Sequence, residues 1–267
     1  MRRGGQLETA VRRARLWFQE GNCLMSIKSK VLAAAATLTM VGGVAVTGAL
    51  TAGTASAATP SCGTFCVNIF SKDFGTYRSP NFTVDVWRQG AKLGQPVILF
   101  KSSNSDPALD WTVSVQGTVG SFCSAGIITN FTCYRWADLP AFEVEYAPFG
   151  VQSGLCMGVP TTAFQNEKVS LVPCGVSSNS VWIVDALDSI LGAHSGFYAP
   201  LINGSNTNFS HPYVLTYPKN GYPTDIPRPQ LTVTNLTGFS QTVAPFLAIV
   251  GTIQSNQLWG ATLGELR

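Results

Sequence analysis

Charged side chains are scarce in this sequence: Asp, Glu, Lys and Arg make up 12% of its 267 residues, against about a quarter in an average soluble protein. That share excludes a disordered tail dominated by one sign of charge. The net charge of +3 is misleading, because seven of the 17 basic residues and only two of the 14 acidic ones precede residue 58. From residue 58 onward, 10 basic residues face 12 acidic ones, a net charge of −2. We therefore expect no nucleic-acid partner, because binding to phosphates needs a basic excess.

Histidine is also scarce, and the motifs of common catalytic and metal sites are missing. The two histidines, His194 and His211, form no His-Glu-x-x-His motif, no Gly-x-Ser-x-Gly elbow is present, and no loop has the Asp-x-Asp spacing of a calcium site. Ser195 follows His194 directly, which is typical of a polar loop rather than of a nucleophile and its base. Glu143 and Glu145 would share one face of a strand, where a glycoside hydrolase could place two acids, but a solvated face is favoured. The sequence predicts no enzyme, no cofactor and no metal.

An apolar run stands near the N-terminus. Residues 31–52 carry no charge, Lys28 and Lys30 precede them, and Ala55–Ala57 form a small-x-small cleavage signature. We expect residues 1–57 to be an N-terminal extension and a signal peptide cleaved after Ala57. A membrane-anchoring helix is the alternative, since roughly 20 apolar residues can span a bilayer, but no basic stop-transfer cluster follows the run. An arginine-rich stretch precedes a complete signal that starts at Met25, so we hypothesise that Met25 is the true initiator.

Residues 58–267 are then predicted to form one domain of a secreted, extracellular protein. No second apolar run of membrane-spanning length follows, so we expect no membrane partner after cleavage. At this size a chain buries roughly 70% of its unfolded surface, which one core can supply.

The cysteines beyond the leader are six in number, and an even count in an exported chain predicts disulfides. Fifteen pairings are possible, and the short spacings suggest that neighbours pair. The spacings are not those of a zinc site, and no histidine lies near them. The suggested pairs are Cys62 with Cys66, Cys123 with Cys133, and Cys156 with Cys174.

Short segments rich in β-branched and aromatic residues alternate with clusters of Gly, Pro, Asn and Ser, a pattern that predicts strands joined by turns. No segment shows a sustained helical repeat, apart from one possible helical turn at 185–191. We therefore predict an all-β fold. The expected strands include 82–87, 96–100, 111–115, 142–146, 169–172 and 231–234.

One pattern repeats along the chain. Residues 94–113 and 166–185 each contain an apolar strand, a Ser- and Asn-rich loop, and a Trp that begins a second strand. A third copy is more divergent, because 211–233 has the strand and a longer Pro-rich loop, while the Trp stands in 255–261. The repeat predicts hairpins that are each closed by a tryptophan.

The middle copy resembles a repeat of the ricin-B-type β-trefoil, which reads Gly-x-Cys-Leu, an apolar strand, Cys and Gln-x-Trp. Gly154–Met157, the strand from Val169, Cys174 and Trp182 follow this order, and Gln257–Trp259 matches the last motif literally. The resemblance covers about half of the chain after the leader. The leader and the polar composition also resemble secreted proteins of actinobacteria.

Two departures from the family pattern affect this expectation. The family's repeats are about 40 residues long, whereas Trp111, Trp182 and Trp259 are 71 and 77 residues apart. Leu109 and Ser180 replace the Gln in the first two copies. The resemblance therefore implies a β-trefoil with long loop insertions, in which three hairpins cap a six-stranded barrel and the three Trp side chains belong to the core.

The resemblance also implies that the protein binds carbohydrate, such as a cell-envelope glycan. Neutral sugars are held by an aromatic face together with planar amide or carboxylate groups. The predicted ligand-binding residues are Asn256, Gln257 and Trp259, with Tyr217 and Tyr222 of the Pro-stiffened loop. Turn residues explain the polar candidates equally well, and the family's binding Asp has no clear counterpart. Further candidates are the loop residues Asn104 and Asp106, or Ser178 and Asn179.

A second class of function fits the same features: a structural or interaction protein of the cell surface with no sugar site. Five Asn-x-Ser/Thr sequons reflect the composition of the loops in a bacterial protein and would mark surface loops in a eukaryotic one. They begin at Asn81, Asn130, Asn203, Asn208 and Asn235.

Overall fold

The computed structural model of the chain describes residues 66–76, 79–101, 111–185, 190–191, 197–237 and 253–263. The predicted leader at 1–57, the Met25 start, Cys62, Asn104, Asp106 and the pair His194 and Ser195 lie outside these residues. Within them, no helix is long and apolar enough to cross a membrane.

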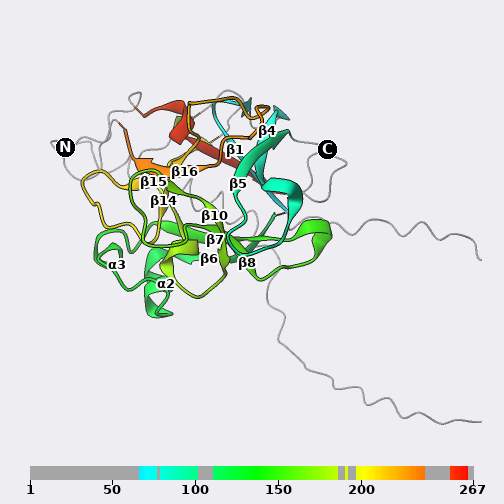
Figure 1. The fold of residues 1–267 in the computed structure, drawn as a ribbon. Coiled ribbons are helices and arrows are strands. Elements are labelled where there is room, and N and C mark those ends of the chain that lie inside the picture. Colours follow the sequence, from blue (N-terminus) through cyan, green and yellow to red (C-terminus); the bar gives the residue numbers. More distant parts are fainter. Residues whose placement is uncertain are drawn as a thin grey trace, which may run out of the picture.

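Strands dominate the described residues, as predicted (Figure 1). Each of the six segments expected to be strands coincides with an observed one within a few residues. The longer strands are β1 (Val67–Ser71), β4 (Phe82–Val86), β5 (Val97–Lys101), β6 (Trp111–Thr118), β7 (Pro140–Tyr146), β8 (Leu155–Gly158), β10 (Ser170–Pro173), β11 (Trp182–Val184), β14 (Leu201–Asn203), β15 (Tyr213–Thr216), β16 (Thr232–Asn235) and β17 (Trp259–Leu263).

Shorter elements lie between these strands. They are the two-residue strands β2 (Gly75–Thr76), β3 (Ser79–Pro80), β9 (Glu167–Lys168), β12 (Ile190–Leu191) and β13 (Phe197–Tyr198), the helices α2 (Val119–Ser124) and α3 (Thr132–Arg135), and the 3-10 turns η2 (Trp87–Gln89), η4 (Pro148–Gly150), η5 (Ser178–Ser180) and η8 (Ser255–Gln257).

Six of the strands close into a barrel. Antiparallel ladders join β17 to β1, β6 to β7, β7 to β11 and β11 to β14. Two isolated bridges complete the circle: Cys66 pairs with Thr112 between β1 and β6, and Ala199, just before β14, pairs with Trp259 of β17. A closed sheet leaves no unpaired edge, which stabilises the barrel and protects it from edge-to-edge association.

Three hairpins, β4–β5, β8–β10 and β15–β16, meet at one end of the barrel. Their meeting point is a ring of three backbone hydrogen bonds. Val97 N donates to Val169 O (3.1 Å), Val169 N donates to Leu231 O (2.9 Å), and Leu231 N donates to Val97 O (2.8 Å). This cyclic exchange between equivalent positions is the signature of a pseudo-threefold axis. The fold is therefore a β-trefoil, as the resemblance implied.

Both faces of part of the barrel are buried. In β11, Trp182 and Val184 belong to the inner core, while Ile183 belongs to a second apolar cluster outside the barrel. That cluster includes Phe122 of α2 and Trp136, which follows α3. The segment between β6 and β7, which carries both helices, therefore packs on the outer face of the barrel. Its length accounts for part of the long spacing between Trp111 and Trp182.

Two of the three suggested disulfides are confirmed. Cys123–Cys133 links α2 to α3, and Cys156–Cys174 joins β8 to the residue after β10. Cys66 is also disulfide-bonded, and its suggested partner, Cys62, lies outside the described part of the chain.

Candidate ligand-binding site

The three tryptophans that begin the closing strands occupy equivalent positions. The indole N–H of Trp111 donates to Val84 O (3.0 Å), that of Trp182 to Met157 O (2.9 Å), and that of Trp259 to Leu215 O (2.8 Å). The three side chains are 1%, 0% and 2% exposed. The prediction that they belong to the core is confirmed. Trp259 is the predicted ligand-binding residue among them, and in this conformation its ring is enclosed by protein.

Asn256 lies three residues before Trp259 and ties its turn to the hairpin. Its Nδ2 donates to Tyr217 O (2.7 Å), and Tyr217 N donates to Asn256 O (3.0 Å). Asn179 stands in the same place before Trp182 and exchanges the same two bonds with Val159 (2.7 and 3.1 Å). The amide nitrogen of Asn256 therefore has a structural role that recurs in a second repeat. Its Oδ1 is buried without a hydrogen-bond partner among the described residues.

Gln257 links three segments of the third repeat. Its Oε1 accepts from Thr237 N (2.9 Å) and Thr237 Oγ1 (2.7 Å), and its Nε2 donates to Thr234 Oγ1 (2.9 Å) and Asn235 O (2.8 Å). The side chain is 2% exposed. The Gln of the Gln-x-Trp motif thus holds the end of β16 against the turn η8.

Tyr217 and Tyr222 are brought together by the Pro-rich loop that follows β15. The Phe74 ring lies between them, 4.8 Å from the Tyr217 ring and 6.2 Å from the Tyr222 ring, centroid to centroid. Tyr217 is 1% exposed, and its hydroxyl donates to Gly221 O (2.8 Å). Burial raises the pKa of Tyr217 above its usual value, and the charges of Asp225 and Asp73 add to the shift.

Tyr222 is the one predicted ligand-binding residue with an open face, because 68% of it is exposed. Its backbone N–H donates to the Asp225 carboxylate (2.7 Å), which fixes the turn that presents the ring. Asn256 and Tyr222 thus both lie close to Tyr217, the first through hydrogen bonds and the second through the Phe74 ring. Gln257 bonds to the end of β16, and Trp259 belongs to the core cluster that also contains Tyr217. A binding role for these five residues stays a prediction.

Glu143 and Glu145 were expected on a solvated face, and this was wrong: both are buried. Glu143 Oε1 accepts from Gly175 N (3.0 Å) and Ser180 Oγ (2.5 Å), and Glu145 Oε1 accepts from Gly154 N (2.6 Å). They fix the turns of the second repeat.

One further polar position is structural as well. Asn203 of a predicted sequon is fully buried, and its Nδ2 donates to Asn179 O (3.0 Å). The nitrogen that a glycan would be attached to is therefore enclosed by the folded protein. Ser178 belongs to η5 beside Asn179.

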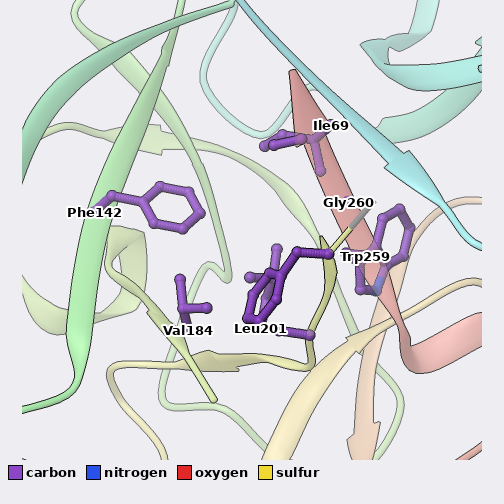
Figure 2. A pocket seen from close by; sticks show the side chains of 9 residues that line it. Ile69, Phe142, Val184, Leu201, Trp259 and Gly260 are labelled. Atoms are coloured by element: carbon purple, nitrogen blue, oxygen red, sulfur yellow. The ribbon is translucent and has the colours of Figure 1, made fainter. Parts of the chain in front are cut away.

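A small void is lined by apolar side chains of several strands, among them Ile69, Phe142, Val184, Leu201 and Trp259 (Figure 2). Its volume is about 10 Å³, which is at the lower limit for one water molecule. A sugar ring cannot enter it. Exposed aromatic residues such as Tyr222 lie on the outer surface of the protein.

Aromatic groups that the sequence analysis did not single out also lie on this surface. One joins Trp87, Phe100 and Arg228, and another joins Phe131, Tyr134 and Phe209 around α3. No local pattern in the sequence indicates either group, because their members come from segments far apart along the chain.

No family model matches the chain, and no curated protein matches it. Solved structures with similar folds include a designed threefold-symmetric protein, ThreeFoil, with a TM-score of 0.44, 14% identity, and coverage of 73% of this chain and 96% of the other. They also include the Rhizoctonia solani agglutinin, with a TM-score of 0.41, 14% identity, and coverage of 75% and 95%. A mosquitocidal holotoxin matches with a TM-score of 0.43 and 12% identity, over 75% of this chain and 17% of the toxin. The trefoil assignment itself rests on the closed barrel and its ring of hydrogen bonds.

Proposed function

We propose that this chain is a secreted, non-catalytic recognition module that binds carbohydrate on its outer surface. The observation that supports the proposal is Tyr222, an exposed aromatic face on a loop stiffened by prolines and fixed by Asp225. Such a ring packs on the C–H face of a sugar at a small entropic cost. The disulfides suit an oxidising compartment outside the cytoplasm, as expected of the secreted actinobacterial proteins that the leader resembles.

The groups around Tyr222 complement an aromatic face. The Asp225 carboxylate and the backbone of the same loop supply acceptors for sugar hydroxyls. The Tyr222 ring packs on the half-buried Phe74, which in turn packs on the buried Tyr217. Buried Glu143 and Glu145 are engaged by backbone N–H groups, which argues for recognition rather than hydrolysis.

A glycan array tests this proposal. Tyr222→Ala is expected to weaken saturable binding by about three- to tenfold, because an aromatic stacking contact contributes about 0.5–1.5 kcal/mol. Tyr134→Ala is the matched control, since Tyr134 is a still more exposed tyrosine on α3. Binding of no glycan at all would support the alternative, a structural or interaction protein of the cell surface.

A further inference from the structure

Arg228 is held in place by two aromatic rings and one hydrogen bond. Its guanidinium carbon lies 4.3 Å from the centroid of Phe100 and 5.7 Å from that of Trp87. Its Nε donates to Pro223 O (3.0 Å). Stacking and this bond fix the plane of the guanidinium before any ligand arrives, so little further entropy is lost on binding.

The two Nη groups of Arg228 differ from its Nε, which has a backbone partner. Within the described ranges they form no hydrogen bond and no ion pair, and the side chain is only partly buried. Arg presents a planar fork that matches the two oxygens of a carboxylate, sulfate or phosphate group. The geometry therefore leaves a fixed, charged fork facing solvent.

Arg88 adds a second guanidinium beside the same tryptophan, with its carbon 5.8 Å from the Trp87 centroid. Arg88 and Gln89 both adopt left-handed backbone conformations, with φ of 59° and 54°. Two successive non-glycine residues in this region are unusual, and such strain concentrates at ligand-binding positions. Here it turns the exposed Arg88 back over Trp87.

The neighbouring charges favour an anion. Lys92 of the same hairpin loop and Lys101 at the end of β5 are exposed. The acidic residues of this region include Asp85, which is buried on β4, and Asp225, whose carboxylate accepts from Tyr222 N. Asp73 is a third, since its charge acts on Tyr217 together with that of Asp225. Among the described residues, no salt bridge joins these three carboxylates to Arg88 or Arg228. The hairpin β4–β5 and the loop 218–230 thus form a basic aromatic patch on a chain whose charge after residue 57 is −2.

We infer that this patch, made of Trp87, Arg88, Phe100 and Arg228, binds the carboxylate or sulfate groups of an acidic glycan. Loop 218–230 carries both Tyr222 and Arg228, so a chain of sugar rings can contact the tyrosine face and the arginine fork together. The inference deepens the proposed function and rests on it, since it specifies the class of carbohydrate.

Paired polymers test the inference on the purified exported protein. Dextran sulfate is compared with dextran, and polygalacturonate with its methyl ester, so that each pair differs only in charge. The charged member is expected to bind at least about tenfold more tightly, with an affinity that falls as salt is added. The two pairs also show whether sulfate or carboxylate is preferred.

Substitutions of single arginines test whether this patch is responsible for the preference for the charged polymer. Arg228→Gln is expected to weaken binding of the charged polymer by about tenfold and to leave the uncharged one unchanged, and Arg228→Lys is expected to restore little, because it lacks the fork. Arg135→Gln, on α3, is the matched control, since α3 lies far from β4 and β5 in Figure 1. If Arg228→Gln does not fold, Arg88→Gln replaces an exposed side chain and is expected to weaken binding severalfold.

Equal affinity for the charged and uncharged polymers, or an equal loss in Arg135→Gln, overturns the anion site while the proposed function stands. Equal binding of polyglutamate overturns the assignment to glycans. If neither charged nor neutral polymers bind, the proposed function fails as well.

Discussion

The role of a polar side chain in this protein is decided by the backbone groups it meets. Asn256 and Asn179 have the residue type expected of a sugar ligand. Each nevertheless ties its turn to a backbone carbonyl two residues after the carbonyl that accepts from the Trp of the same repeat. The first repeat has Ala108 at the equivalent position, so this repeat lacks the amide. In these two repeats, the amide three residues before the Trp is therefore a structural tie.

Glu167 is expected to make stability depend on pH. Burial raises the pKa of its carboxyl above the usual value, so the folded state holds this proton more tightly than the unfolded state does. Its contribution to stability is then present below the unfolded pKa and is lost as pH rises through the folded pKa. Glu167→Gln removes the ionisable carboxyl, and with it the loss of stability at high pH. The variant is expected to be more stable than the original protein at pH 7. The two proteins are expected to be equally stable at about pH 3, which lies below both the folded-state and the unfolded-state pKa of Glu167.

Urea unfolding at the two pH values measures this difference. The substitution keeps the size of the side chain and leaves the backbone pairing of β9 with β16 in place. The same difference in unfolding free energy at both pH values would show that packing, and not the carboxyl charge, is responsible.

Among the elements, strands were predictable and helices were not. Alternating β-branched and aromatic residues identify strands such as β4 and β16 because one face of each packs on the core. Helix α2 has six residues and α3 has four, too short for a helical repeat to be read. They persist because Thr118 and Ser121 cap α2 reciprocally and Cys123–Cys133 joins the two helices.

The disulfide between Cys156 and Cys174 is expected to stabilise the hairpin β8–β10. It closes a separation of 18 residues, for which the chain-entropy estimate is about 3 kcal/mol. Replacing both cysteines with Ser should lower the free energy of unfolding by that amount, as measured by urea titration.

The pair Cys123 and Cys133 provides the comparison. This disulfide closes a separation of 10 residues. On the same estimate, its removal should lower the free energy of unfolding by about 0.5 kcal/mol less than removal of Cys156–Cys174 does. An unchanged midpoint after loss of Cys156–Cys174 would mean that the hairpin is held by its pairing and packing alone.

For the molecule as a whole, the ring formed by Val97, Val169 and Leu231 marks the point where all three repeats depend on one another. The three amides should therefore exchange with solvent only through global unfolding. Hydrogen exchange followed by NMR is expected to give the three amides one common free energy, equal to that measured by urea.

Amides in the loop 218–230 provide the contrast, because much of it is exposed, including Tyr222 and Ile226, and such segments open locally. Fast exchange at one member of the ring, with protection at the other two, would show that a repeat opens independently and that the trefoil is not one cooperative unit.

The sequence by itself determined the all-β class, two confirmed disulfides and the core position of the three Trp residues, because each follows from local alternation, short spacing or residue type. Only the tertiary structure decided that Asn256 bonds to the backbone of Tyr217 and that Gln257 bonds to backbone groups and threonine hydroxyls. It also decided that Glu143 and Glu145 are buried and that Arg228 meets Trp87 and Phe100. These outcomes depend on segments that are distant along the chain. Their contacts form only when the hairpins close around the pseudo-threefold axis, and no pattern within one segment contains that information.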